Sequence, residues 1–585
     1  MSYRTAAWAL MILMSGVYPS AQTQAPAPTK QPAKGGMFSI YKPPDLVDLG
    51  TRREDTLESR VRDGKLELTE ADVVQLALQN NVDIQVERYA PVYNLWQIEK
   101  SRGILNPSFT LAATHNYKQD PTTSVLQGTD PSLSVTTDYS ATYRKPFVTG
   151  TDVTAGFTEE RLRSSSSFYS FNPSFTSGFN FSLTQHLLRD AGSLSRGHYL
   201  QVSQLNRDIS EEDFATRVTD VVRSVLDTYW DLVFLTQDIK VKEDGLNLAQ
   251  VVLDQNRAQV DAGTLARLDV TQAEAEVATR QEDLVTARYA RRITEAALKK
   301  LISSRPDPGL VTAEITPTSQ APATPRAAAV NVGQAIQRAQ DMSPEVRRAL
   351  IDLESRKIDV AFTANQLKPN LDVTAGYSQT GLGGTRILKD FNKSFLDPPC
   401  PPDPQPCSLP GGISDSLSSL VRGSYPFDSK TGQEVTTDGR IHYYGYFASI
   451  NMRILLGNDD ARATNAQTRI LLAQAEERLR GTRQNIAYQV REAAERLERD
   501  RARIQSAEVT VRFNEERLAG EQEKASQGES TTRFVLESQR DLSDARSRLA
   551  RARADAMKAQ IAYDRYAGEL LSSQGVQVKQ QLPLK

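Results

Sequence analysis

Few residues in this chain could perform chemistry. Cysteine occurs at Cys400 and Cys407, and histidine occurs at His115, His186, His198 and His442. No HExxH, GxSxG or dinucleotide-binding fingerprint occurs, and the run GLGGT at 381–385 lacks the lysine that completes a phosphate-binding loop. No acid–base constellation, metal site or cofactor is therefore predicted, and the chain is not expected to be an enzyme.

The N-terminus has the pattern of an export signal. Arg4 precedes the apolar run Ala6–Val17, and small residues follow at Ser20 and Ala21. Because the run is too short to span a bilayer, residues 1–21 are predicted to be a cleaved signal peptide.

Composition limits the class of protein further. The 585 residues include 70 Lys and Arg against 72 Asp and Glu, a net charge of −2, so nucleic acid is not an expected partner. Beyond the N-terminus no apolar run reaches the roughly 18 to 20 residues of a transmembrane helix, which excludes a multi-helix membrane protein. A transmembrane β-barrel remains compatible, because its strands are short and alternate in polarity.

The chain is predicted to be internally duplicated. An offset of 262 pairs Ala77 with Ala339 and Pro107 with Pro369, and an offset of 265 pairs Gly263 with Gly528. The predicted segments are a signal peptide (1–21), a Pro-rich extended linker (22–65), a first repeat (66–315), a linker (316–329), a second repeat (330–568) and a C-terminal tail (569–585).

Each repeat is predicted to contain helices too long for a globule. Two continuous helices, at about Ser195–Ala262 and Asp459–Gln527, would each span roughly 100 Å. From Ile486 to Leu518 the seam positions recur in alternating steps of four and three, as in a coiled coil. Shorter helices are expected at about 70–105, 264–303, 332–368 and 529–568. Together they would build a long antiparallel helical cylinder, the alternative being an ordinary coiled-coil rod.

Segments between the helices alternate with a period of two. Six strands are predicted, each roughly 9 to 11 residues long, at about 109–117, 135–143, 152–158, 175–183, 371–377 and 444–452. Each has one apolar or aromatic side and one small or hydroxylic side, which suits a barrel with lipid outside and water inside. The alternative is a soluble sandwich, whose buried face would be richer in Val, Ile and Leu.

These features together resemble the TolC outer-membrane factor family. The resemblance rests on LTEADVVQLALQNNVDI at 68–84, the proline that opens each first strand, FSLTQHLLRDAG at 181–192, and the paired glycine turns, and it covers about 66–568. It implies a homotrimer, in which a transmembrane β-barrel in the outer membrane of a Gram-negative bacterium continues into a periplasmic helical coiled-coil barrel. Such proteins are exit ducts of tripartite efflux pumps and type I secretion systems, with a periplasmic adaptor and an inner-membrane transporter as partners.

The sequence departs from the family in two places. His186 stands where many relatives have proline, which we interpret as a tolerated local change. The first repeat also holds four strands where the family needs two, with an extra hairpin at about 134–163. The extra hairpin would either widen a trimeric barrel from 12 to 18 strands or fold outside the barrel wall.

The resemblance also points to residues that would carry the function. The turns Ala262, Gly263, Thr264 and Gln527, Gly528, Glu529 would lie at the periplasmic tip and receive the adaptor, although glycine is also ordinary helix punctuation. Asp269 and Glu537 resemble the family's acidic constriction, where three-fold symmetry would make rings of carboxylates that attract cations. The alternative is that both are solvated helix charges. Ser530 and Phe534 replace polar gate partners of relatives.

The two cysteines are expected to form a structural bond. Cys400 and Cys407 lie in the proline-dense stretch PPCPPDPQPC, inside a long loop at 381–440. In an exported protein this spacing predicts a local disulfide that staples an extracellular loop.

Three classes of function follow from these observations. The first is a passive trimeric export duct in contact with outer-membrane lipid. The second is a structural periplasmic coiled-coil protein without channel activity, which would have no reason to keep lipid-facing aromatic alternation. The third, an enzyme, would need a catalytic cluster that the sequence lacks.

Overall fold

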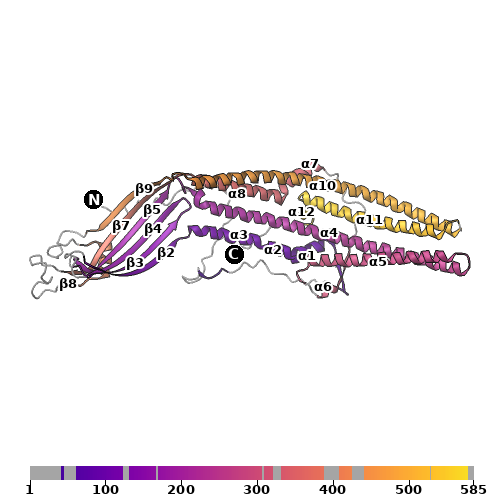
Figure 1. The fold of residues 1–585 in the computed structure, drawn as a ribbon, viewed down its shortest axis with the longest axis horizontal. Helices are drawn as coiled ribbons and strands as arrows, with labels where there is room; N and C mark the ends of the chain where they lie inside the picture. Colours follow the sequence, from indigo (N-terminus) through magenta and orange to yellow (C-terminus); the bar gives the residue numbers. More distant parts are fainter. Residues whose placement is uncertain are drawn as a thin grey trace, which may run out of the picture. The chain divides into compact units, whose positions relative to one another are not determined.

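The computed structural model describes residues 41–44, 61–122, 131–166, 169–305, 308–319, 331–387, 408–424, 441–527 and 529–576. The predicted signal peptide, most of the first linker, Cys400, Cys407 and Gly528 lie outside these residues. The chain separates into two compact units, one made of Met1–Glu54 with Val578–Lys585 and the other of Asp55–Gln577. Every helix and strand named below belongs to the second unit (Figure 1).

The helices begin and end close to the predicted positions. They are α1 (Glu70–Asn80), α2 (Val82–Glu87), α3 (Tyr89–Arg102), α4 (Ser193–Asp261), α5 (Arg267–Ile302), α6 (Pro308–Thr312), α7 (Val332–Met342), α8 (Pro344–Gln366), α9 (Ile413–Arg422), α10 (Asp459–Ser526), α11 (Thr532–Tyr566) and α12 (Leu570–Ser573). With 69 and 68 residues, α4 and α10 are each about 100 Å long. Among the described residues, no helix has an apolar stretch long enough to cross a membrane.

The element bounds repeat at the offsets found in the sequence. Adding 262 to the bounds of α1 gives 332 and 342, the bounds of α7, and adding 262 to Ser108 gives Asn370, the start of the second set of strands. Adding 265 to Arg267, where α5 begins, gives Thr532, where α11 begins. The order of short helices, strands, long helix and shorter helix therefore occurs twice.

The predicted single helix at 70–105 is wrong, because the chain breaks at Asn81. Its backbone is extended there, and its side-chain oxygen accepts the amides of Asp83 and Ile84, which caps the next helix. Its side-chain nitrogen donates to the carbonyl of Leu301 at the end of α5 (2.9 Å). Ser343 breaks the corresponding helix in the second half, where Pro344 begins α8.

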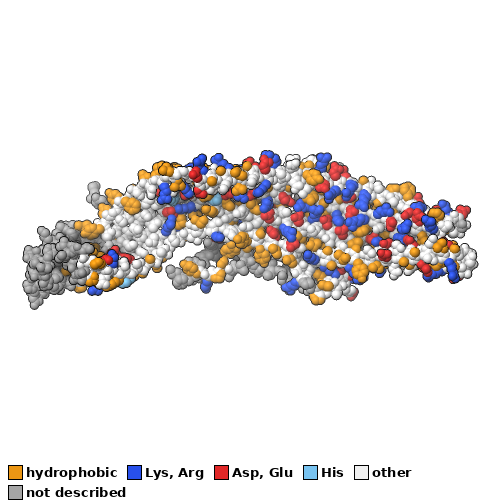
Figure 2. Space-filling view, viewed as in Figure 1, with side chains coloured by type: hydrophobic (Ala, Val, Ile, Leu, Met, Phe, Trp, Pro, Cys, Tyr) orange, Lys and Arg blue, Asp and Glu red, His pale blue; other side chains and the backbone are white. Residues whose placement is uncertain are grey.

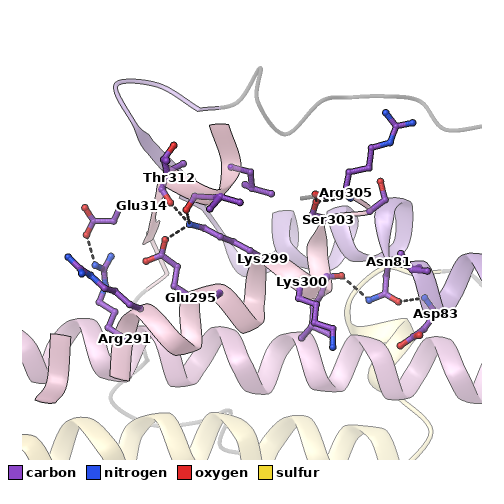
Figure 3. Close-up of a pocket in the computed structure, with 18 residues that line it drawn as sticks. Asn81, Asp83, Arg291, Glu295, Lys299, Lys300, Ser303, Arg305, Thr312 and Glu314 are labelled. Atoms are coloured by element: carbon purple, nitrogen blue, oxygen red, sulfur yellow. Dashed lines mark hydrogen bonds and ion pairs between the residues drawn. The ribbon is translucent and has the colours of Figure 1, made fainter. Parts of the chain in front are cut away.

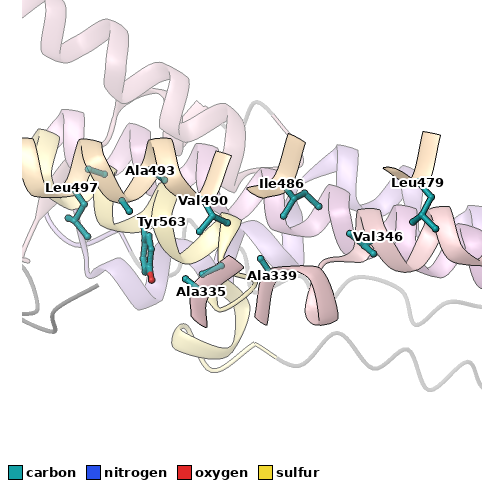
Figure 4. Packing of buried hydrophobic residues seen from close by; sticks show 12 residues of the cluster. Ala335, Ala339, Val346, Leu479, Ile486, Val490, Ala493, Leu497 and Tyr563 are labelled. Carbon is teal, nitrogen blue, oxygen red and sulfur yellow. The ribbon is translucent and has the colours of Figure 1, made fainter. Parts of the chain in front are cut away.

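The predicted heptad seam of α10 is buried from Ile486 to Ile504 and at Leu518, and partly buried between them. Val490, Leu497 and Ile504 are almost completely shielded from solvent, and Asp500 is buried with its carboxylate bound by Arg499. Figure 4 shows how this seam packs, with residues of α7, α8, α10 and α11 in one cluster: Ala335, Ala339, Val346, Leu479, Ile486, Val490, Ala493, Leu497 and Tyr563. The apolar stripe of α10 is therefore covered by helices from its own half of the chain.

The strands form one antiparallel sheet at one end of this unit. The long strands are β2 (Ser108–Asp120), β3 (Ser132–Pro146), β4 (Thr151–Ser164), β5 (Phe171–His186), β7 (Asn370–Ile387) and β9 (Tyr443–Arg453), and they pair in the order β2-β3-β4-β5-β7-β9. The short β8 (Ser408–Leu409) pairs with the far end of β7. The extra hairpin β3–β4 therefore lies within the same sheet as the other strands.

The register places the predicted apolar residues on one face. Phe109, Tyr143, Ala155, Phe181, Tyr377 and Tyr446 are paired across six strands in a single row. The next row, on the opposite face, is Thr110, Thr142, Gly156, Asn180, Ser378 and Gly445. The predicted strand lengths were too short, since β3, β5 and β7 have 15, 16 and 18 residues. Pairing continues beyond the apolar stretch into polar sequence, where alternation gives no signal.

A small second sheet was not predicted. β1 (Lys65–Leu68) pairs in parallel with β6 (Glu314–Pro317). The buried hydroxyl of Tyr229 on α4 donates to the carbonyl of Leu68 (3.0 Å) and accepts the amide of Ser319 (3.2 Å). This hydroxyl therefore ties the segment before α1 and the segment after β6 to the middle of α4.

Candidate functional site

The first helix-to-helix turn has the geometry that its glycine predicted. Gly263 has a φ of +78° and follows the last residues of α4. Its amide donates to the carbonyl of Val260 (2.9 Å), and the amide of Thr264 donates to that of Gln259 (2.9 Å). This pair of bonds is the Schellman motif, which requires a left-handed residue and so favours glycine. A Cβ at Gly263 would meet nothing within 4 Å, so the conformation rather than close packing accounts for the glycine in this chain.

The second turn repeats the outer hydrogen bond of the first. The amide of Glu529 donates to the carbonyl of Lys524 (2.9 Å), five residues earlier, as Thr264 does with Gln259. The hydroxyl of Ser530 donates to Glu521 (2.7 Å), and this bond holds the pKa of Glu521 below its usual value. The two turns thus share this backbone hydrogen bond at an offset of 265.

One buried side chain connects the two tips. Asn256, on the last turns of α4, is only 3% exposed. Its side-chain nitrogen donates to the carbonyl of Asp269 on α5, and its oxygen accepts the hydroxyl of Thr532 on α11, each at 3.3 Å. The sequence analysis missed Asn256. It could have been recognised as a polar residue that shares the buried side of the helix with Val252 and Leu253, close to the turn.

The two predicted gate acids lie near the starts of equivalent helices, with Glu537 about one turn further along its helix than Asp269. Asp269 lies in the first turn of α5, where a carboxylate interacts favourably with the helix N-terminus, and Glu537 lies on α11. Both are half-buried. Within the described part of the chain, neither carboxylate makes an ion pair or hydrogen bond. The structure of one chain therefore places both acids near the tips.

The contact between the two long hairpins is rich in polar interactions. Those that connect α4 to α11 include, in antiparallel order, Asp220 with Arg565 (2.7 Å), Asp231 with Lys558 (2.9 Å), Asp238 with Ser547, and Asn256 with Thr532 (3.3 Å). Leu518, Val535 and Leu542 of α10 and α11 form an apolar cluster, and Leu248 of α4 packs against it from the other hairpin. Figure 2 shows acidic and basic side chains interspersed over the helices.

This contact also contains a carboxyl group whose ionised form is unfavourable. Asp227 on α4 lies beside Asp231, and burial raises its pKa above the usual value despite Arg223 and Lys558 nearby. One of its oxygens is buried without a hydrogen-bond partner. The polar contacts between the hairpins therefore include one group, the Asp227 carboxylate, whose burial is electrostatically unfavourable.

A cavity of about 840 Å³ lies between the C-terminal part of α5, α6, β6 and the start of α2 (Figure 3). Its charges mostly satisfy one another, since Arg291 pairs with Glu314 (2.5 Å) and Lys299 with Glu295 (2.8 Å). Lys299 also donates to the carbonyls of Val311 and Ala313. These contacts fasten α6 and β6 to α5. No group of acidic, His or Cys side chains among the described residues could hold a metal ion.

His186 takes part in a polar cluster where the sheet meets the helices. Its Nδ1 lies 2.6 Å from Asp372 on β7, and its Nε2 lies 3.7 Å from Asp152 on β4. Arg196, near the start of α4, donates to Asp152 (2.8 Å). His186 therefore connects β5 with β7 and β4, and Asp152 connects this cluster with the start of α4.

Comparisons with known proteins agree with this fold. The family model described as outer membrane efflux protein matches residues 73–304, from α1 through α5. No curated protein sequence matches the chain at a significant level.

Solved structures match over most of the chain. The CmeC outer membrane channel of Campylobacter jejuni has 14% identity, covers 86% of each chain and has a TM-score of 0.55. The outer membrane protein VceC of Vibrio cholerae has 13% identity, covers 85% of this chain and 96% of its own, and has a TM-score of 0.56. A membrane protein from Pseudomonas aeruginosa has 13% identity, covers 90% and 94%, and has a TM-score of 0.58. At these identities the likeness shows the fold.

The fold of most of the chain and the family match over residues 73–304 are those of outer membrane efflux proteins, a class of channels and not of enzymes. This match agrees with the resemblance to TolC-like outer membrane factors that the sequence motifs predicted. It supports a location in the outer membrane with the helical part in the periplasm.

Proposed function

We propose that three copies of this chain form the passive exit duct of a tripartite efflux pump or a type I secretion system. The observation that carries the proposal is the sheet with one apolar face, joined directly to helices of about 100 Å that end in two matched turns. Such a molecule can span the outer membrane with its sheet and reach across the periplasm with its helices. A periplasmic adaptor and an inner-membrane transporter would complete the pathway.

The sheet would close into a barrel between copies. Among the described residues, β2 pairs only with β3 and β9 only with β7, so each copy offers two open edges. Joining β9 of one copy to β2 of the next would satisfy both edges. Because each copy contributes six long strands, a trimer would have 18, and the hairpin β3–β4 would belong to the wall rather than lie outside it.

The periplasmic end would contain the gate. Rings of three Asp269 and three Glu537 carboxylates would attract cations at the aperture. Asn256 would hold the two hairpins of one copy together in the closed state through its bonds to Asp269 and Thr532. Opening would then separate polar contacts, which water can solvate, together with the packing of Leu248 against the cluster of Leu518, Val535 and Leu542.

The turns at Ala262, Gly263, Thr264 and at Gln527, Gly528, Glu529 would receive the adaptor. Their support is the free space around Gly263 and the matching backbone geometry of the two turns. Equivalent turns on both hairpins would give a trimer six similar docking positions.

The test is the conductance of the purified full-length protein in a planar lipid bilayer, together with its mass by native mass spectrometry. We expect a trimer with cation-selective openings. Two neighbouring residues of β9 give a matched pair of variants, since Ile450 lies on the apolar face, 74% exposed, and Ser449 on the opposite face. Ile450→Lys should block insertion, because a lysine facing lipid costs about 2–4 kcal/mol, whereas Ser449→Lys should insert and conduct.

The opposite result would identify the other class of protein. Recovery of the wild type in the soluble periplasmic fraction, with no conductance and no difference between the two variants, would indicate a structural coiled-coil protein. Stable conductance in all three proteins would contradict the assignment of the apolar face to lipid.

A further inference from the structure

The short helix α9 lies on the apolar face of the sheet, within the segment 381–440 that was predicted to be a loop. The register pairs Glu159 with Ser177 and Ser177 with Gly381, so these three residues share the face that carries Phe181 and Tyr377. A Cβ on Gly381 would lie 2.2 Å from the carbonyl oxygen of Ser416 in α9. Gly383 is equally restricted, at 2.4 Å from the amide nitrogen of the same residue. The glycines of the GLGGT run therefore make room for α9 against the strand.

The side of α9 that faces the sheet is polar. The hydroxyl of Ser416 donates to one carboxylate oxygen of Glu159 (3.1 Å), and the hydroxyl of Ser177 donates to the other. Ser419 donates to the carbonyl of Leu382 (3.1 Å). Ser177 and Ser416 are fully buried and Glu159 is 3% exposed. The helix thus covers a carboxylate that would otherwise stand on the apolar face.

The side of α9 that faces away from the sheet carries an apolar stripe. Ile413, Leu417 and Val421 follow one another at intervals of four, which places them along one side of a helix. They are 46%, 38% and 72% exposed. A helix packed on a water-soluble protein normally has the reverse arrangement, with apolar residues inward and serines outward.

This stripe continues an apolar surface that the sheet already presents. The row next to Gly381 holds Phe179 and Tyr444, and the following row holds Phe181 and Tyr446, all of them exposed. Gln379 in the first of these rows donates its side-chain amide to the carbonyl of Leu420 at the end of α9. The C-terminal end of α9 therefore meets the aromatic belt that is typical of a membrane–water boundary.

We propose that α9 is a lipid-facing helix, whose partner is the acyl chains at the boundary of the membrane's outer leaflet. It covers Glu159 and replaces that carboxylate with Ile413, Leu417 and Val421 on the outer surface. The proposal rests on the proposed barrel, in which this face of the sheet contacts lipid. It assigns a role to the GLGGT run, which is to seat the helix.

The test uses quenching of tryptophan fluorescence by bromine attached to lipid chains. Leu417→Trp is made in the full-length protein and reconstituted in vesicles of dibrominated phosphatidylcholine and of the unbrominated lipid. Tyr446→Trp, on the apolar face of β9, is the positive control, and Ser378→Trp, on the opposite face of β7, is the negative control. The unmodified protein supplies the background of its native tryptophans, and planar-bilayer conductance verifies that each variant is folded.

We expect the added fluorescence of Leu417→Trp to be quenched several-fold more than that of Ser378→Trp and about as strongly as that of Tyr446→Trp. Quenching of Tyr446→Trp without quenching of Leu417→Trp would overturn the lipid-facing helix and leave the proposed duct intact. Absence of quenching in both would overturn the lipid-facing assignment of the sheet, and with it the proposed function.

Discussion

Replacing Asn256 with alanine should favour the open state of the proposed duct. Asn256 is buried and bonds the carbonyl of Asp269 and the hydroxyl of Thr532, so it connects both hairpins of one chain near their tips. Alanine removes both bonds, so the carbonyl of Asp269 and the hydroxyl of Thr532 lose their hydrogen bonds to residue 256. The apolar packing of each hairpin, including Leu518 and Val535, is unchanged by the substitution.

The size of the effect follows from the number and length of the bonds. Each is 3.3 Å long, and a typical net contribution of a hydrogen bond to stability is about 1 kcal/mol. Loss of both therefore costs the closed state about 1–2 kcal/mol per chain, which is roughly a 5- to 30-fold change in the ratio of open to closed tips. If the three chains of a trimer open independently, the effect on the whole trimer is the product of three such changes.

Single-channel recording in a planar bilayer measures this ratio directly. We expect Asn256→Ala to spend more time in larger openings than the wild type. Asn514→Ala is the matched control, because Asn514 bonds only the carbonyl of Thr510 in its own helix (2.8 Å). Equal open times for Asn256→Ala and the wild type, in a protein that remains trimeric, would refute the idea that this side chain holds the tips closed.

Three further predictions concern the same helices. Asp269→Ala and Glu537→Ala should each raise conductance and lower selectivity for cations, and unchanged currents would show that neither carboxylate lines the gate. Asp227→Asn should stabilise the protein at pH 7 by on the order of 1 kcal/mol in thermal unfolding, because burial raises the pKa of Asp227 and its ionised form is unfavourable in the folded state. Because the folded-state pKa of Asp227 is raised, the wild type loses stability as pH rises from the unfolded value of 3.8 through the folded-state pKa. The stability advantage of Asp227→Asn should therefore shrink as pH falls toward 4. An advantage that does not change with pH would contradict this cause. Gly263→Ala should destabilise the first tip by about 1 kcal/mol, because φ is +78° there. Faster hydrogen exchange confined to that turn would report this loss of stability. Unchanged exchange would mean that the turn tolerates a side chain.

Local periodicity in the sequence was enough to predict much of the fold. The steps of four and three along Ile486–Leu518 predicted the buried side of α10, and two-residue alternation predicted which face of each strand is apolar. Gly263 predicted the turn after α4, because few other residues adopt a positive φ. Each of these signals is set by residues within a few positions of one another.

The same local reasoning failed where distant segments decide the outcome. At the break between α1 and α2, the side chain of Asn81 bonds the carbonyl of Leu301, 220 residues further along the chain, and the sequence pattern does not reveal this contact. The ends of the strands could not be predicted from the sequence, because polar residues such as Lys118 and Arg163 pair as readily as apolar ones once a neighbouring strand is present.

The parts of the candidate site that matter most for function belong to this second group. The sequence by itself determined the two turns, the two long helices and the apolar face of the strands, because these follow from short-range periodicity and backbone conformation. Only the tertiary structure placed six strands in one sheet, set Asn256 between Asp269 and Thr532, and laid α9 over Glu159. These three arrangements join residues far apart in the chain, and hydrogen bonding and packing across such distances leave no repeating pattern in the sequence.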